Sequence, residues 1–228
     1  SLSNTDGTKT IVSTGSDTTA SLADVNAMGF NARSDASTIV STGVSTATNI
    51  TATEDFTING VTIGPNATDT PSASALATHL NTYSASTNVT ASAKSEVTLQ
   101  MLTATSAGAT TVTAASSTMI VNGTAIILTQ NNTVTQTIAT INTTLSGVGV
   151  NVVASQGDGA SDIVLTSSSG ETIEVTDVAA STNPHISQAT NIDGVITATG
   201  ALAGIRVEFG GQLTLTNTSG GDITFGTV

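Results

Sequence analysis

The sequence predicts a strand-rich α+β fold in which small antiparallel sheets are each packed by one short helix, in repeated units. Two observations predict this fold. Apolar residues alternate with Ser and Thr over many short segments, as half-buried strands require, whereas two other segments have helical spacing. One pattern of residues also occurs twice, and its second half occurs a third time. A unit repeated in this way is typical of structural modules rather than of catalytic sites.

The repeated pattern begins at Phe56–Ile63 in its first copy and at Met119–Ile126 in its second. The same spacing separates Val89–Ser92 from Val152–Ser155, which shows that the period is regular. The later parts recur as well: Ser95–Leu99 as Ser161–Leu165, and Ile163–Val175 as Leu213–Phe225.

In the first copy, the strand segment Asp55–Ile63 contains the hairpin-type turn Asn59-Gly60. A helix is expected next, with Thr70 as its N-cap and Pro71 at its first position. Its apolar residues fall on one face: Leu76, Leu80 and Tyr83. Two strands, 88–93 and 96–102, are expected to follow as a hairpin.

The second copy predicts the same layout, beginning with a strand–turn–strand segment at Met119–Leu128 around Asn122-Gly123. Spacings of four and three residues place four apolar side chains on one helix face: Val134, Ile138, Ile141 and Leu145. Gly147 is expected to end this helix. Three strands follow from alternating residues: Val150, Val152 and Ala154, then Ile163 and Leu165, then Ile173 and Val175.

The two ends of the chain suggest a third unit that is divided in two. Lys9–Thr14 has the pattern of a strand and Thr18–Met28 that of a short helix, while Gly204–Phe209 and Leu213–Phe225 resemble a rear half. The sequence therefore predicts three domains. They are a discontinuous base domain of residues 1–50 plus 186–228, a first inserted unit of 51–110, and a second inserted unit of 111–185.

Composition excludes several classes of function. Among 228 residues there are no cysteines, so neither disulfides nor thiolate metal sites can form. The net charge is −12 with only 4 basic residues, which argues against binding to nucleic acid or to anionic lipid. No apolar run approaches the ~20 residues that span a bilayer. The chain has no signal peptide and begins with Ser1, so we interpret it as an internal piece of a longer protein.

The sequence predicts no catalytic, cofactor-binding or metal-binding residues, and therefore no enzyme. The two histidines, His79 and His185, have no carboxylate nearby at metal-ligand spacing. Neither a nucleophile elbow nor a phosphate-binding loop occurs. Gly157–Asp162 resembles a small calcium loop, but it lacks further ligands and is interpreted as an Asp-Gly turn. Glu54-Asp55 is interpreted as a pair of solvated charges at the start of a strand.

Asn-x-Ser/Thr sequons are frequent, but chance accounts for most of them because about one residue in three is Ser or Thr. They occur at Asn49, Asn66, Asn88, Asn122, Asn131, Asn142 and Asn217. The sequons are therefore not evidence of N-linked glycans.

The repeated residues resemble the "IN" motif of bacterial flagellins and hook-associated flagellar proteins. In the first copy the resemblance rests on Ile58–Val61 before a short helix, then on Asn88–Ser92 and a Leu-Thr strand. The second copy supplies the matching residues Ile141-Asn142, Gly149-Val150, Ala154-Ser155 and Val164–Ser167. The first copy departs from the motif because Leu80-Asn81 replaces Ile-Asn and because no Gly precedes Val89.

The resemblance covers about two thirds of the chain and implies the surface-exposed outer domains of a bacterial flagellar filament protein, most simply a flagellin. Such proteins polymerise through long terminal helices, which this chain lacks. The resemblance further implies an extracellular location, lateral contacts between outer domains, exposure to host antibodies, and sugars on surface hydroxyls.

Two alternatives remain open. The first is a hook–filament junction protein, which shares the motif. The second is an adhesin module of a bacterial surface protein. The helix in each unit and the scarcity of aromatic residues, with 2% Phe, Trp and Tyr, count against the adhesin.

Overall fold

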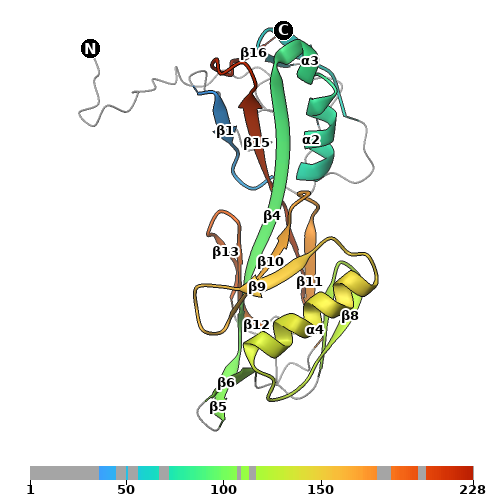
Figure 1. Cartoon of the computed structure of the whole chain (residues 1–228), viewed down its shortest axis with the longest axis vertical. Helices are drawn as coiled ribbons and strands as arrows, with labels where there is room; N and C mark the ends of the chain where they lie inside the picture. Colours follow the sequence, from blue (N-terminus) through green and yellow to red (C-terminus); the bar gives the residue numbers. More distant parts are fainter. Residues whose placement is uncertain are drawn as a thin grey trace, which may run out of the picture.

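A computed structural model describes residues 36–44, 50, 56–66, 72–106, 109–112, 117–178, 186–199 and 204–227. These residues form two lobes arranged along the long axis of the molecule and joined by one long strand (Figure 1). The fold is strand-rich α+β with several small antiparallel sheets and few short helices, as predicted. The predicted elements at Lys9–Thr14 and Thr18–Met28 lie outside the described residues.

The first lobe contains both the first and the last described strands. It comprises β1 (Thr38–Val40), β2 (Phe56–Ile58), β3 (Val61–Ile63), α2 (Ala73–Asn81), α3 (Ser84–Thr87), the first half of β4 (Val89–Met101), β15 (Gln212–Asn217) and β16 (Phe225–Thr227). β15 pairs with β1 and with the first half of β4, while β16 pairs with β2.

The second lobe begins with the second half of β4. It also comprises β7 (Ser117–Val121), β8 (Thr124–Leu128), α4 (Val134–Gly147), β9 (Val153–Gln156), β10 (Asp162–Ser167), β11 (Ile173–Asp177), β12 (Ile186–Asn191), β13 (Ile196–Thr199) and β14 (Arg206–Phe209). β4 lies between β10 and β12, and a second sheet has the order β14-β11-β7-β8. A separate hairpin of β5 (Thr103–Ser106) and β6 (Ala109–Val112) projects from the end of this lobe (Figure 1).

The two lobes share one topology of hairpin, helix and three strands. The hairpin β2–β3, helix α2, first half of β4, β15 and β16 correspond to β7–β8, α4, β9, β10 and β11. In both lobes the last strand pairs with the first strand of the hairpin. The predicted turns at Asn59-Gly60 and Asn122-Gly123 are confirmed, and all four residues have positive φ. Asn and Gly tolerate this left-handed conformation better than other residues do.

The predicted hairpin of 88–93 and 96–102 is wrong, because these residues form the single strand β4. No Gly, Pro, Asn or Asp lies between its halves. Its inward alternation also continues without a change of phase, from Val89 and Ala91 to Val97, Leu99 and Met101. A slip of one residue would have reversed the two faces of the strand, so the unbroken phase favours one continuous strand.

The C-terminal strands are distributed differently from the predicted base domain of 1–50 plus 186–228. β1 does pair with β15, but β15 and β16 also pair with β4 and β2, which were expected in the 51–110 unit. β14 pairs with β11 and β12 pairs with β4, so both belong to the second lobe. The second lobe is therefore inserted between β4 and β15 of the first. The shared rear-half pattern reflects the equivalence of β15–β16 with β10–β11.

Each lobe has its own apolar core beneath its helix. The predicted helix faces are confirmed for Leu76 and Leu80 of α2 and for Ile141 and Leu145 of α4, which are buried, while Ile138 packs at the margin. Tyr83, predicted on the same face as Leu80, lies beyond the end of α2 and packs half-buried against the core. The N-cap of α2 is Ser72 and not Thr70. α4 begins with a capping box between Thr133 and Gln136, and Gly147 is its last residue, as expected.

The lobes meet at a narrow contact between backbones, which we call the waist. Gly170, in the turn after β10, lies against Ala93 of β4, and its carbonyl oxygen accepts a hydrogen bond from the Ser74 amide at 3.0 Å. Gly211, just before β15, packs in the same way against Lys94 and Ser95. Because two glycines allow the backbones to approach this closely, the waist adds contacts to the shared strand β4.

Candidate functional site

Two asparagines of the hairpin turns connect the hairpin of each lobe to the strand that pairs with it, β16 in the first lobe and β11 in the second. In the first lobe, Asn59 donates its N–H to the Thr224 carbonyl and its Oδ1 accepts from the Thr224 N–H, both at 2.8 Å. In the second lobe, Asn122 makes the same pair of bonds to Glu174, at 3.0 and 2.7 Å. Their Nδ2 atoms donate to the carbonyls of Thr87 and Thr172. The Asn of each Asn-Gly pair is therefore an architectural residue as well as a turn former.

A second pair of asparagines, in the C-terminal halves of α2 and α4, closes the outer edge of one strand in each lobe. The side-chain amide of Asn81 accepts from the Ala91 N–H at 2.7 Å and donates to the Ala91 carbonyl at 2.8 Å. Asn142 makes the same two bonds to Ala154, at 2.7 and 2.9 Å. Each amide satisfies backbone groups that an edge strand otherwise leaves open. Leu80-Asn81 and Ile141-Asn142 are recognisable in the sequence as motif residues, but their spacing does not predict this contact.

His79 has a structural contact rather than a metal-ligand environment. Its Nε2 donates to the Gly64 carbonyl at 2.8 Å, since a carbonyl oxygen can only accept, and the Tyr83 hydroxyl accepts from the Gly64 N–H at 3.2 Å. The two rings pack edge to face with centroids 5.5 Å apart. His79 and Tyr83 thus occupy both backbone groups of the residue that follows β3. Among the described residues, no three His, Asp or Glu side chains gather as a metal site would require.

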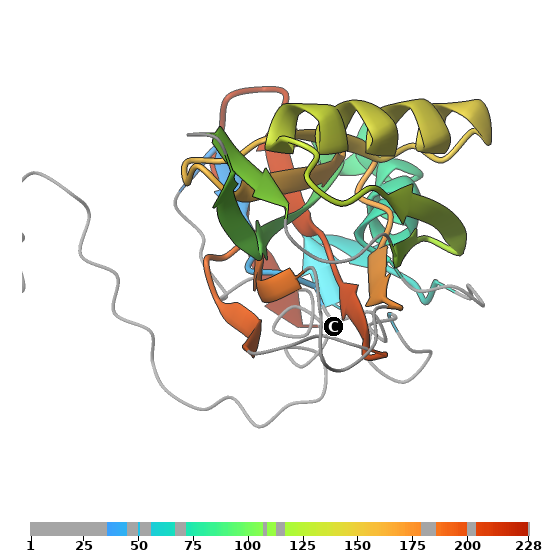
Figure 2. The same ribbon diagram turned by 90° about the horizontal axis from the view of Figure 1, so that it is seen from below.

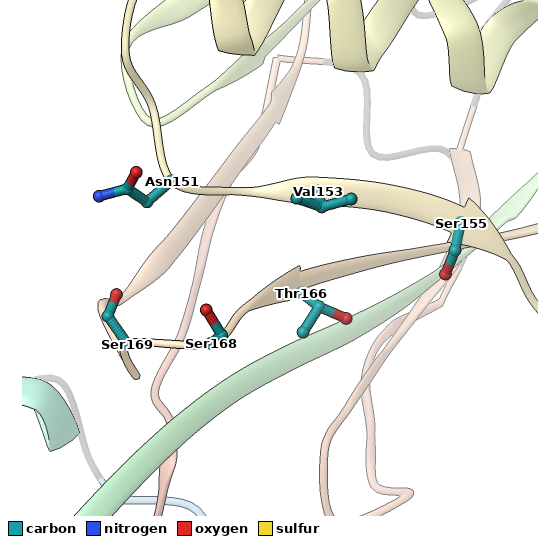
Figure 3. Close-up of a pocket in the computed structure, with 6 residues that line it drawn as sticks. All are labelled: Asn151, Val153, Ser155, Thr166, Ser168 and Ser169. Carbon is teal, nitrogen blue, oxygen red and sulfur yellow. The ribbon is translucent and has the colours of Figure 1, made fainter.

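A shallow depression of about 470 Å³ lies over the outer face of β9 and β10. Figure 3 shows its lining residues on neighbouring strands and on the turn after β10. They are Asn151, Val153, Ser155, Thr166, Ser168 and Ser169. An adjoining depression of about 540 Å³ extends from Asn151 and Val153 toward the end of α4. The lining offers hydroxyl and amide groups but no acid, base or aromatic ring, so it holds nothing that would activate a serine.

The possible calcium loop is an ordinary turn. The turn Gly157–Asp162 is closed by its own contacts, because Asp162 Oδ2 accepts from the Gly159 N–H at 3.1 Å and the Gly157 N–H donates to the Asp162 carbonyl. Glu54-Asp55 and His185 lie outside the described residues.

The sequon asparagines are mostly occupied by the fold. Asn66 and Asn217 are buried, and Asn122 and Asn142 hold the contacts described above, whereas Asn88 and Asn131 are exposed in the left-handed conformation. Asn49 lies outside the described residues. A glycan on Asn66 or Asn217 would therefore need local unfolding.

The described basic residues are held by carboxylates at the surface. Lys94 pairs with Glu96 at 2.6 Å, and Arg206 bridges Glu174 and Glu208 at 2.6 and 2.7 Å. Glu174 and Glu208 lie directly opposite each other on β11 and β14, so Arg206 offsets a repulsion between like charges. Neither cation is available as part of a basic patch.

The chain matches no family model, and no curated protein matches it. In the part of the chain that the structure describes, every helix is too short or too polar to cross a bilayer.

Proposed function

We propose that this chain forms the surface-exposed outer domains of a bacterial flagellar filament protein, a flagellin, and that its role is structural rather than enzymatic. One observation carries the proposal. The residues through which the sequence resembles the flagellar motif occupy equivalent places in the two lobes and make equivalent backbone contacts, as Asn59 and Asn122 do. A motif used in this way maintains a module that can be repeated, which suits a variable surface region.

The proposed mechanism is mechanical and colloidal. In the filament the first lobe is the base, because it contains both β1 and β16, and the second lobe is the outer tip. The continuous strand β4 and the glycine contacts at the waist oppose bending between the lobes. A net charge of −12 keeps the outer surface hydrated and the filaments apart. The proposed location is extracellular, on the flagellar filament.

Immunogold electron microscopy on the source bacterium, with antiserum against this chain, tests the proposal. Gold along whole filaments is expected for a flagellin. Gold confined to the base of the filament would instead indicate a hook–filament junction protein. Gold on the cell body alone would overturn the flagellar proposal in favour of an adhesin module. Antiserum absorbed with the purified chain is the control for specificity.

A further inference from the structure

A long uncharged segment builds one side of the second lobe. Residues 97–157 contain no Asp, Glu, Lys or Arg, although the whole chain has a net charge of −12. This segment supplies the hairpin β7–β8, helix α4 and strand β9. Helix α4 lies beside both β8 and β9 (Figure 1), and it runs along one edge of the molecule in the view of Figure 2. The exposed side chains of the segment, which we call the uncharged surface, include Ala125, Ile127, Thr135, Ala139, Thr143 and Val148.

The strand β8 borders this surface, and no described residue pairs with its outer edge. Among the described strands it pairs only with β7, through a hairpin with a two-residue turn. In such a hairpin Val121 and Thr124 share hydrogen bonds, so the backbone groups of Ala125 and Ile127 point away from β7. Within the described residues these groups have no hydrogen-bond partner. The side chain of Ile127 is also 69% exposed, which is unusual for an edge strand.

The equivalent edge in the first lobe is closed. By the spacing of the repeat, Gly64 corresponds to Ile127, and its N–H and carbonyl are taken by Tyr83 and His79. When α2 and α4 are aligned on Asn81 and Asn142, Tyr83 corresponds to Thr144 and His79 corresponds to Thr140. Their short hydroxyls bond back to helix carbonyls, those of Thr140 and Gln136. The second lobe therefore lacks, at these two positions, side chains that could close β8.

Two other edges of the second lobe are also protected. β9 is closed by the Asn142 amide on Ala154. β14 carries the charged residues Arg206 and Glu208, which discourage pairing with another strand. β8 thus differs from them in being open, uncharged and apolar.

We propose that β8 is an interface with a second copy of this chain, in which two β8 strands pair antiparallel about a twofold axis. With Ile126 of both copies at the axis, Ala125 of one copy lies opposite Ile127 of the other. Each then donates its outward N–H and accepts at its outward carbonyl. The two four-stranded sheets become one continuous sheet, and both Ile127 side chains are partly covered.

A second copy of this chain fits this edge better than a positively charged partner does. A cationic partner would be drawn to the acidic remainder of the molecule rather than to a segment without carboxylates. Two copies of this chain repel each other where their carboxylates face each other, but the uncharged surface brings no like charges together. This contact is a property of the chain itself, and its test does not depend on the flagellar proposal.

Sedimentation velocity over protein concentrations from about 10 μM to about 1 mM tests the contact, since weak self-association has dissociation constants near the upper value. The wild-type chain is expected to show a reversible monomer–dimer equilibrium, and Ala125→Lys is expected to remove it. Thr62→Lys is the matched control, because exposed Thr62 holds the equivalent position on β3. A wild type that stays monomeric at about 1 mM overturns the proposal. A dimer that survives Ala125→Lys, or one lost only in Thr62→Lys, also overturns it.

Two further measurements separate strand pairing from other kinds of contact. Ala125→Pro removes only an outward N–H, so an unchanged thermal melt with at least a tenfold weaker dimer is expected. Raising the salt concentration should strengthen the dimer, because it screens the repulsion between two acidic molecules. A dimer that Ala125→Pro leaves intact, or that salt weakens, would mean that β8 pairing is not the contact.

Discussion

Gly170 of the second lobe lies directly against Ala93 of the first, and a side chain on this glycine would collide with the methyl group of Ala93. Gly220 is the equivalent of Gly170 in the repeat, and the two have nearly the same φ, +76° and +75°. A side chain on Gly220, however, would meet only open space. The repeat therefore supplies two glycines with the same backbone conformation and different surroundings.

Substitution of these two glycines separates backbone strain from packing at the waist. Gly220→Ala should cost about 1–2 kcal/mol of unfolding free energy, from left-handed strain alone. Gly170→Ala should cost a further 1–3 kcal/mol, roughly, because the added methyl overpacks the waist. Urea unfolding of both variants measures the difference. Equal losses would show that the contact at the waist contributes little to stability.

Removal of the amide that closes β9 should destabilise the second lobe. Asn142→Ala leaves the Ala154 N–H and carbonyl without their partners and should cost about 1–3 kcal/mol. Asn81→Ala should cost less, because Asn81 is more exposed and water can replace its amide. Thermal unfolding monitored by circular dichroism measures both. A greater loss for Asn81→Ala would contradict the assigned difference in burial.

Asn122→Asp, which mimics deamidation at the Asn-Gly turn, should give pH-dependent stability. The ionised side chain cannot donate to the Thr172 carbonyl and instead sets a negative oxygen against it, which outweighs the Glu174 N–H bond that it keeps, so the folded state raises the pKa of the new side chain. The pKa of this side chain is then higher in the folded state than the value of about 3.9 in the unfolded state. The free energy of unfolding of the variant, relative to wild type, is therefore highest below about pH 3.9 and decreases as the pH rises through the folded pKa.

The free energy of unfolding of Asn122→Asp, measured at about pH 3.5 and about pH 7 and compared with wild type at the same pH, checks this sign. Asn131→Asp is the control, since Asn131 is also left-handed (φ 65°) but exposed. Its stability relative to wild type should change little over the same range. A loss for Asn122→Asp that grows toward low pH would contradict the assigned hydrogen bond.

A charge in the core face of α4 should unfold the second lobe in proportion to burial. Ile141 is completely buried, so Ile141→Asp should cost at least several kcal/mol. Ile138→Asp should cost less because Ile138 lies at the margin of the core, and Ala139→Asp on the exposed face should cost about 0.5 kcal/mol or less. Unfolding curves of the three variants test this order. An unchanged curve for Ile141→Asp would show that the helix is assigned wrongly.

The candidate contacts were only partly predictable. The two Asn-Gly turns could be predicted because a two-residue turn with two positive φ angles selects those residue types locally. The bonds from Asn59 to Thr224 and from Asn122 to Glu174 could not, because they join residues far apart in the chain. The bonds from Asn81 to Ala91 and from Asn142 to Ala154 were not predictable for a related reason, since an Asn on a helix can bond to several kinds of backbone group.

The sequence by itself determined the repeat, the strand-rich α+β class and the helix faces, because these follow from local periodicity and turn chemistry. Only the tertiary structure decided how the copies combine. The repeat predicts a hairpin near Lys94, although no turn residue interrupts 89–101 and the inward alternation keeps its phase. Pairing with β15, β10 and β12, which are distant in the chain, holds β4 as one strand through both lobes. The pattern in Leu213–Phe225 does not say which lobe it completes either, because β15 and β16 fit any matching sheet. Closure of the first lobe was settled by pairing with β4 and β2, an interaction between distant segments that buries Leu213 and Leu215.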